Sequence, residues 1–385
     1  MYILKRSIII LMLLFIMPLA LAQEWTFLDS DVTNDLNSIS CPDELTCYVA
    51  GGAPYIGGPA IILKTEDGGE NWESQPLPTT SPLRGIDCVD ANNCFATGGE
   101  ILKTTNGETW TISDDRDATL WDIDATSSTH AVAVGNLGTK LRTIDGADWN
   151  GYMPPRMGPF EESLAAVMFT SSSVGWAVGQ GETMLYTDDG GETWITRDPN
   201  IGVGLGLSDI FSLDGETIWA CGPFTHIIKS VDSGWNWEQH RIPDIGGCGA
   251  IEFANESFGW FLGNGGISYS HDGGETWENQ EDLERLLFFR DIECFGPELC
   301  YGVGDDGTII RYGEPGAAAL VVETPQEEIE EESEEERGEL RAVYNNSGVF
   351  RAYRGCPAVT DDCEAGWNPV FEYDENNCAI SYICV

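Results

Sequence analysis

Basic residues are scarce in this chain. Its 385 residues include 19 lysines and arginines against 64 aspartates and glutamates, which gives a formal net charge of −45. The phosphates of a nucleic acid would repel such a chain, and so would an anionic membrane surface. We therefore exclude nucleic acid and anionic membranes as partners. The charge favours solubility, and it fits either a basic partner or adaptation to a salty extracellular setting.

Long apolar runs are also missing, with one exception at the N-terminus. Lys5 and Arg6 precede an almost wholly apolar run over 7–17, and Ala20-Leu21-Ala22 fits the small-x-small cleavage rule. We expect residues 1–22 to be a signal peptide; a retained membrane anchor is the alternative. No cysteine follows the cleavage point to carry a bacterial-type lipid anchor, and no later run approaches the roughly 20 apolar residues of a second span. The mature chain is expected to be exported and not stably inserted in a membrane.

What the chain has instead is an internal repeat. The phrase Thr-Asp-Asp-Gly-Gly-Glu-Thr-Trp at 187–194 recurs, more or less intact, six times along the sequence. The period of roughly 38 to 47 residues is typical of solenoids, propellers and arrays. The copies end at Trp72, Trp110, Trp149, Trp194, Trp237 and Trp277.

Each repeat has the pattern of four short antiparallel strands separated by glycine-containing turns, which is typical of a propeller blade. A seventh unit begins at 289–292, continues to 312 and stops before a fourth strand. Residues 24–28 look like a fourth strand with nothing before it. Joining the two fragments closes the ring and removes an exposed sheet edge. We therefore predict an all-β, seven-bladed propeller over 23–314 whose N-terminal strand completes the last blade.

The repeated phrase resembles the Asp-box, or bacterial neuraminidase (BNR) repeat, which lies on the hairpin between the third and fourth strands. Aspartate in a turn accepts hydrogen bonds from backbone N–H groups, glycine permits unusual backbone angles, and tryptophan buries apolar area between blades. The same turn recurs around the ring, whereas an active site occurs once. We therefore interpret the boxes as structural, not as catalytic or calcium-binding. The full-length copies contribute Asp67 and Trp72, Asp189 and Trp194, Asp232 and Trp237, and Asp272 and Trp277.

The twelve cysteines, even in number, suit an oxidising compartment. Three pairs share the spacing Cys-x5-Cys and bracket the turn between a first and a second strand, where facing positions lie within disulfide range. No histidine or further cysteine lies near these pairs, so we expect no metal. Cys221 and Cys248 fall on the same rim and are predicted to join blades five and six. The three local pairs are Cys41/Cys47, Cys88/Cys94 and Cys294/Cys300.

The C-terminal part differs in composition. Residues 315–339 are rich in glutamate and are expected to form an acidic disordered linker. Residues 340–385 hold four cysteines, which predicts a small disulfide-stapled module with three possible pairings. Its acidic residues lack EF-hand spacing, which favours a solvated surface over a calcium site. Its aromatic residues fit either a small core or a contact surface. The four cysteines are Cys356, Cys363, Cys378 and Cys384.

The blade pattern as a whole, an apolar strand, then Gly-Trp-x-x-Gly, then Ile-x-x-Thr-x-Asp-Gly-Gly-x-Thr-Trp, resembles the photosystem II stability/assembly factor-like family over residues 24–313. Sortilin-type receptors and sialidases share the box more distantly. Intact repeats, the absence of a catalytic constellation and the appended cysteine-rich module favour a secreted, non-enzymatic binding or scaffold propeller without a cofactor, one that helps the assembly of an exported or envelope protein. In photosynthetic members the resemblance implies binding of a membrane-protein subunit through a basic surface. The nineteen lysines and arginines of this chain do not favour such a surface.

A glycan-active enzyme, of the sialidase or another glycoside-hydrolase type, is the alternative. The tripeptide 241–243 copies the Arg-Ile-Pro motif of sialidases, but it follows the fifth box instead of preceding the boxes. The arginine cluster and tyrosine nucleophile of a sialidase cannot be assembled from equivalent positions. The remaining support is a set of carboxylates near the channel, Asp122, Asp209 and Asp291.

Propellers usually bind at the mouth of the central channel, where the first strands begin. Arg84, Trp121 and Arg290 stand out there from an otherwise small or polar set. Two arginines on one rim suit a carboxylate or an acidic peptide. The alternative is that each pairs with a nearby aspartate such as Asp122 or Asp291. The aligned rim positions are Asn37, Arg84, Trp121, Ala165, Ser208, Gly249 and Arg290.

A long turn over 53–59 in the first blade is expected on the same face as the channel mouth. Loops on a rigid scaffold commonly carry specificity, so Tyr55 in this turn is a further candidate contact residue. The expected partner is a protein or peptide, with a glycan as the alternative.

Overall fold

The computed structural model describes residues 24–313, with gaps at 53–58, 117, 155–160, 198, 200–205, 224–225, 242–245 and 281–287, together with residue 315 and four strands between 341 and 384. The expected signal peptide, Tyr55, the glutamate-rich stretch and the pairing of the last four cysteines lie outside the described residues. The chain divides into two compact units, 1–320 and 321–385. Among the described residues, none of the helices has the length and apolar character needed to cross a bilayer.

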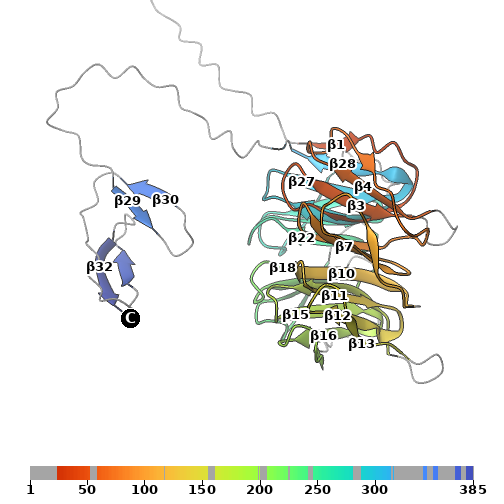
Figure 1. The fold of residues 1–385 in the computed structure, drawn as a ribbon. Helices are drawn as coiled ribbons and strands as arrows, with labels where there is room; N and C mark the ends of the chain where they lie inside the picture. Colours follow the sequence, from red (N-terminus) through yellow and green to blue (C-terminus); the bar gives the residue numbers. More distant parts are fainter. Residues whose placement is uncertain are drawn as a thin grey trace, which may run out of the picture. The chain divides into compact units, whose positions relative to one another are not determined.

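Seven four-stranded antiparallel sheets make up the first unit, and they follow one another in chain order (Figure 1). The predicted seven-bladed, all-β propeller is confirmed. In six blades the four strands are consecutive in the sequence, so each blade is a meander of short hairpins.

The strands of the seven blades are bounded as follows. Blade 1 comprises β2 (Leu36–Ser40), β3 (Cys47–Gly51), β4 (Ile61–Thr65) and β5 (Glu73–Ser74); blade 2 comprises β6 (Gly85–Asp90), β7 (Asn93–Thr97), β8 (Ile101–Thr104) and β9 (Thr111–Asp114). Blade 3 comprises β10 (Leu120–Ser127), β11 (His130–Gly135), β12 (Lys140–Thr143) and β13 (Trp149–Tyr152); blade 4 comprises β14 (Leu164–Phe169), β15 (Gly175–Gly179), β16 (Met184–Thr187) and β17 (Ile195–Thr196). Blade 5 comprises β18 (Asp209–Ser212), β19 (Ile218–Cys221), β20 (His226–Ser230) and β21 (Glu238–Arg241); blade 6 comprises β22 (Cys248–Phe253), β23 (Gly259–Gly263), β24 (Gly266–Ser270) and β25 (Glu278–Asn279). Blade 7 comprises β26 (Phe289–Cys294), β27 (Cys300–Gly304), β28 (Ile309–Tyr312) and β1 (Trp25–Leu28); three short 3-10 turns are η1 (Asn136–Gly138), η2 (Gln180–Glu182) and η3 (Asp305–Gly307).

The ring is closed by its first strand. β1 pairs antiparallel with β28, with Trp25 opposite Tyr312 and Leu28 opposite Ile309 (Figure 1). The Trp25 ring lies edge-on to Trp260 of blade 6, with the ring centroids 5.1 Å apart, and Trp25 is buried. Pairing this strand covers the outer edge of β28 and buries an aromatic side chain against the neighbouring blade, and both effects stabilise the closed ring. The predicted N-terminal closure is confirmed.

The hydrophobic core lies between blades and not within one sheet. The second strands of blades 1, 4, 6 and 7 are buried at all five positions, because each is covered on both faces by neighbouring blades. Trp176, Trp219 and Trp260 occupy corresponding positions in β15, β19 and β23 and are almost completely buried. Each of the core clusters combines side chains from adjacent blades, for example Trp176 of blade 4 with Ile210 and Ile218 of blade 5.

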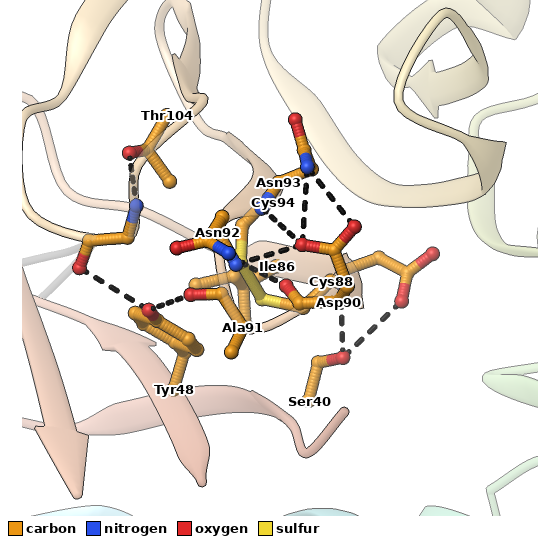
Figure 2. Close-up of a disulfide and its surroundings, with 12 residues drawn as sticks. Ser40, Tyr48, Ile86, Cys88, Asp90, Ala91, Asn92, Asn93, Cys94 and Thr104 are labelled. Atoms are coloured by element: carbon orange, nitrogen blue, oxygen red, sulfur yellow. Dashed lines mark hydrogen bonds between the residues drawn. A yellow bond between two sulfur atoms is a disulfide. The ribbon is translucent and has the colours of Figure 1, made fainter. Parts of the chain in front are cut away.

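Polar contacts at the blade ends reinforce this packing. In Figure 2 the Tyr48 hydroxyl of blade 1 donates to the Ala91 carbonyl of blade 2 at 2.7 Å, beside the disulfide of Cys88 and Cys94. Asp90 accepts hydrogen bonds from the backbone N–H groups that follow it in the same turn. A buried tyrosine thus satisfies its hydroxyl by bonding the next blade, which fixes the spacing of the two sheets.

The Asp-box turns have a common geometry. In blade 4, Asp189 accepts hydrogen bonds from the Thr187 hydroxyl at 2.8 Å and the Thr193 N–H at 2.9 Å. The Gly191 N–H donates to the Thr187 hydroxyl, and Gly191 has a φ of +81°, which a side chain would disfavour. Asp67, Asp232 and Asp272 make equivalent bonds in blades 1, 5 and 6. Trp72 and Trp277 are buried, whereas Trp194 and Trp237 are partly buried.

Four disulfides join the described cysteines of the propeller. Three of them span the hairpin between a first and a second strand, with Cα–Cα distances of 4.0–4.1 Å, and join Cys41 to Cys47, Cys88 to Cys94, and Cys294 to Cys300. The fourth joins Cys221, at the end of β19, to Cys248, at the start of β22, and so links blades 5 and 6 covalently.

The second unit contains two hairpins. β29 (Arg341–Tyr344) pairs with β30 (Phe350–Tyr353), and β31 (Pro369–Tyr373) pairs with β32 (Ala379–Cys384), both antiparallel. Both sheets lie within residues 340–385, for which a small disulfide-stapled module is expected.

Candidate functional site

A cavity lies at the mouth of the central channel. It has a volume of about 410 Å³ and is lined by the residues that precede or begin the first strands. The strand registers explain this placement, because Leu36, Leu120, Leu164, Cys248 and Phe289 all pair with a glycine that ends the second strand of the same blade. The lining contains all seven rim positions inferred from the sequence, Asn37, Arg84, Trp121, Ala165, Ser208, Gly249 and Arg290.

Arg84 and Trp121 form a stacked pair on this rim. The Arg84 guanidinium lies over the Trp121 ring, 4.0 Å from its centroid, within the range of a cation–π interaction. The Trp121 Nε1–H donates to Asn136 Oδ1 at 2.6 Å, which fixes the orientation of the indole. The pair joins blades 2 and 3 and presents a rigid, partly exposed surface to the cavity.

Arg290 is arranged differently. Its guanidinium bonds Asp305 in the turn after β27 at 2.5 Å, and it lies 3.4 Å from Asp35, which precedes β2 of blade 1. The alternative that a rim arginine pairs with a nearby aspartate holds for Arg290, but its partners are Asp305 and Asp35 and not Asp122 or Asp291. Arg290 uses loop aspartates beside the rim instead, because the side chains of Asp122 and Asp291 accept hydrogen bonds from backbone N–H groups in the channel.

Five lining residues were not among the inferred rim positions: Cys248, Asn264, Phe288, Phe289 and Asp305. Phe288 lies directly before β26 and is 50% exposed, and Asn264 forms an isolated bridge with it from the turn after β23. The available signal was weak: an extra phenylalanine before the aligned strand start, in the pair Phe288-Phe289. Phe288 gives the cavity an exposed apolar wall.

Acidic side chains lie on the first strands, which surround the channel below the mouth. Several of them accept a hydrogen bond from the first strand of the next blade: the Val167 N–H donates to Asp122 at 2.8 Å, and the Ile251 N–H donates to Asp209 at 2.8 Å. The Ile39 N–H donates to Asp291 in the same way, at 2.9 Å. These carboxylates hold neighbouring blades together around the channel. The acidic side chains are Asp87, Asp122, Asp124, Asp209, Glu252, Asp291 and Glu293.

The channel changes the acidity of these groups. Loss of hydration raises the pKa of Asp209 to about 7 and that of Asp291 to about 6, although the donated N–H bonds act in the opposite direction. Burial also raises the pKa of Asp122 and Asp124 well above the ordinary aspartate value, and neighbouring carboxylates add to the effect. Protein encloses each group even where part of its surface faces the channel, so burial disfavours the charged form of all these acids.

The described residues contain no group of three or more histidine, cysteine, aspartate or glutamate side chains placed to hold a metal ion. Of the described residues lining the mouth, Asp305 is the one carboxylate, and Arg290 neutralises it. The mouth can therefore offer aromatic stacking, a guanidinium and polar hydrogen-bonding groups to a ligand.

Comparison with known proteins agrees with the blade geometry. A family model described as photosynthesis system II assembly factor YCF48 matches residues 102–198 and 156–244. The chain is thus similar to photosystem II assembly factors with a BNR propeller. It is 27% identical over 282 residues to the photosystem II assembly protein Ycf48 of Synechococcus sp. (strain JA-2-3B'a(2-13)), covering 67% of this chain and 80% of that protein.

Solved structures share the fold of this assembly factor-like propeller. The structure of YCF48 bound to D1 peptide superposes with a TM-score of 0.61 at 20% identity, over 76% of this chain and 96% of that one. A streptogramin B lyase structure superposes with a TM-score of 0.62 at 12% identity, over 75% of this chain and 97% of that one. At these identities the likeness concerns the propeller architecture alone, since one such fold supports unrelated functions.

Proposed function

We propose that this propeller is a non-enzymatic assembly factor that binds a peptide segment of an exported or envelope protein at the channel mouth. The observation that carries the proposal is the stacked pair of Arg84 and Trp121 on the rim of a 410 Å³ cavity. Tryptophan and arginine are enriched among the residues that contribute most of the binding energy at protein interfaces, and here both side chains are already held in place.

The chemistry of the rim favours a peptide. Phe288 and Trp121 supply apolar contact area, while Arg84, Ser208 and Asn264 supply polar groups at the edge of the same cavity. A cavity of this volume accepts one or two side chains of an extended segment. Two relatives in the comparisons are consistent with such a role: one is named a photosystem II assembly protein, and another was solved bound to a peptide.

The positions of the carboxylates support a binding function over catalysis. A glycosidase places two carboxyl groups on either side of a bond in an open site. Here Asp122, Asp209 and Asp291 accept backbone N–H bonds between blades, and Asp305 at the mouth is paired with Arg290.

We further propose that the protein works outside the cytoplasm. Four disulfides in the described part of the propeller fit an oxidising compartment, because thiols are kept reduced in most cytosols.

Site-specific photo-crosslinking in cells that export the protein tests the peptide-binding proposal. A benzoylphenylalanine at position 288, in the mouth, should give a discrete adduct with a protein. The same probe at position 112, an exposed isoleucine on the outer strand of blade 2, should not. Arg84→Glu or Trp121→Ala should abolish the adduct. Arg142→Glu, with the same charge change on β12, should leave it intact.

Two results would contradict the proposal: an absence of adducts at position 288, or the same adducts at both probe positions. Release of fluorophore by the purified protein from any of a panel of fluorogenic glycosides would favour the enzyme alternative instead.

A further inference from the structure

The boundary between blades 4 and 5 differs from three other blade boundaries. At each of those three, a basic residue at the next-to-last position of the third strand of one blade pairs with a glutamate in the box of the next: Arg142 with Glu192, Lys229 with Glu275 and Arg311 with Glu70, at 2.7–3.1 Å. Between blades 4 and 5, Tyr186 takes the position of the basic residue and Trp235 takes the position of the glutamate. Both partners of the ion pair have been replaced by aromatic residues.

A cation from elsewhere joins the two rings. Arg197, which follows β17, places its guanidinium 3.6 Å from the centroid of Trp235 and 4.3 Å from that of Tyr186. Its Nη1 donates to the Ser233 carbonyl within the same box, at 3.4 Å. Trp235 is therefore held on one side by a guanidinium that is itself stacked on a second ring.

Trp235 does not contribute to the hydrophobic core. Its side chain is 70% exposed, whereas Trp237, two residues later in the same box, is partly buried and donates its Nε1–H to the Gly234 carbonyl. A rigidly held tryptophan with an open face binds a partner at low entropic cost, which is why tryptophan is enriched in interaction sites.

A hollow adjoins the same box hairpin. It has a volume of about 330 Å³, with Leu213 and Val231 as apolar walls and Asp214 and Glu256 as acidic ones. Its one basic residue, Lys229, is already paired with Glu275 at 2.7 Å. Val231 is 64% exposed and Leu213 is 45% exposed. The hollow thus combines two exposed apolar walls with a negative rim.

This surface lies at the opposite end of the blade from the channel mouth. In blade 5, Asp209 pairs with Cys221 near the mouth, whereas Ser212, Ile218 and Ser230 meet at the other end, where the box begins. A ligand at the mouth therefore does not occupy the hollow.

We propose that Trp235 and the hollow, which lie on the same box hairpin toward blades 4 and 6 respectively, form a second docking surface that takes a short basic segment of a partner protein. A lysine or arginine side chain enters the hollow, with its aliphatic stem against Leu213 and Val231 and its charge near Asp214 and Glu256. A neighbouring apolar side chain of the segment covers the open face of Trp235. A basic segment is favoured over a neutral or acidic one, because the rim of the hollow is acidic and the chain carries a net charge of −45.

Fluorine NMR of the full chain labelled with 5-fluorotryptophan tests the proposal. The Trp235 resonance is assigned by its loss in Trp235→Phe, and the Trp121 resonance by its loss in Trp121→Phe. The probe is a synthetic peptide of alternating lysine and leucine; the control peptide has glutamate in place of lysine. The lysine peptide should shift the Trp235 resonance and leave that of Trp121 unchanged, and higher salt should weaken this binding. The glutamate peptide should shift neither.

Two matched variants separate local contact from overall charge. Val231→Lys and Ile144→Lys each add one positive charge at the same position of a box, and both residues are 64% exposed. Val231→Lys should weaken binding of the lysine peptide by about tenfold, because it places a like charge in the hollow, whereas Ile144→Lys should not weaken it. Trp235→Gln, which removes the aromatic face without adding a charge, should also lower the affinity without lowering the melting temperature.

The proposal is overturned if the lysine peptide leaves the Trp235 resonance unmoved, if the glutamate peptide shifts it equally, or if Val231→Lys and Ile144→Lys behave alike. A shift of the Trp235 resonance by a neutral oligosaccharide such as cellohexaose, and not by the peptide, would also overturn it and assign the surface to glycans.

Discussion

The aspartates of the boxes and the aspartates of the channel accept the same kind of hydrogen bond but have opposite acidities. Asp189 in a box is exposed, and although slight desolvation acts against it, bonds donated by Thr193 and Thr187 hold its pKa at about 2. Asp209 in the channel also accepts backbone N–H groups, yet loss of hydration raises its pKa to about 7. The difference shows that solvent access, more than the hydrogen bonds, sets the charge of a carboxylate in this fold.

The largest effect expected from this comparison is the dependence of the free energy of unfolding on pH. A folded-state pKa above the unfolded value gives stability that is present below about pH 4 and lost as pH rises through the folded pKa. Asp291 and Asp209 should therefore make the free energy of unfolding fall between about pH 4 and 7, by on the order of a few kcal/mol. Urea midpoints measured at pH 5 and pH 8 check this. Asp209→Asn should reduce the difference between the two midpoints, and an unchanged difference would contradict the assignment.

Removing a channel carboxylate should have the next largest effect. Asp122→Ala leaves the Val167 N–H without its partner in the channel and should lower the free energy of unfolding by about 2–3 kcal/mol. Asp122→Asn keeps an acceptor without the cost of a buried charge, so it should be much less destabilising. Chemical denaturation of the two variants at pH 7 makes the measurement, and equal losses would show that the hydrogen bond is unimportant.

Removing a box aspartate should lower the free energy of unfolding by a smaller amount, and its contribution should be lost at low pH and not at high pH. Asp189→Ala removes the acceptor for the Thr193 N–H and should cost about 1 kcal/mol at pH 7. The pKa of Asp189 lies below its ordinary value, so its contribution is present above about pH 4 and is lost as pH falls towards 2. The difference in melting temperature between wild type and variant should therefore shrink on acidification. A difference that grows instead would refute the contrast with the channel.

The smallest expected effect concerns the exposed ion pairs between boxes. Arg142→Ala breaks the 3.0 Å pair with Glu192 and should cost about 0.2–1 kcal/mol, less at high salt. Lys103→Ala in blade 2 is the matched control, because Lys103 bonds the Ser128 carbonyl instead of a carboxylate. Salt titrations of the melting temperature should distinguish the two variants.

The period of the repeat was enough to predict the fold. The boxes placed the hairpins, and the incomplete units at 24–28 and 289–312 located the closure between β1 and β28. Aligning the blades also placed the rim residues, because strands in equivalent blades share a register and begin at the same end of the ring. In a repeat protein, residues at equivalent positions of the repeat lie at equivalent positions of the fold.

Departures from the repeat were harder to predict. The sequence did not identify which aspartates pair with Arg290, because Asp305, 15 residues away, and Asp35, 255 residues away, both lie in loops whose paths the repeat does not determine. Trp235 was passed over because its box is otherwise regular. Its signal appears only when two neighbouring blades are compared, with tyrosine in place of the basic residue in one and tryptophan in place of glutamate in the next.

The pairing of β1 with β28 has a consequence for the order of events as the protein is made. Thr26 and the Arg311 carbonyl that it bonds are 285 residues apart, so the segment that is synthesised first is the one whose partner arrives last. Until β28 has been produced, β1 and Trp25 have no strand to pair with. The ring can therefore close only after almost the whole propeller has been synthesised.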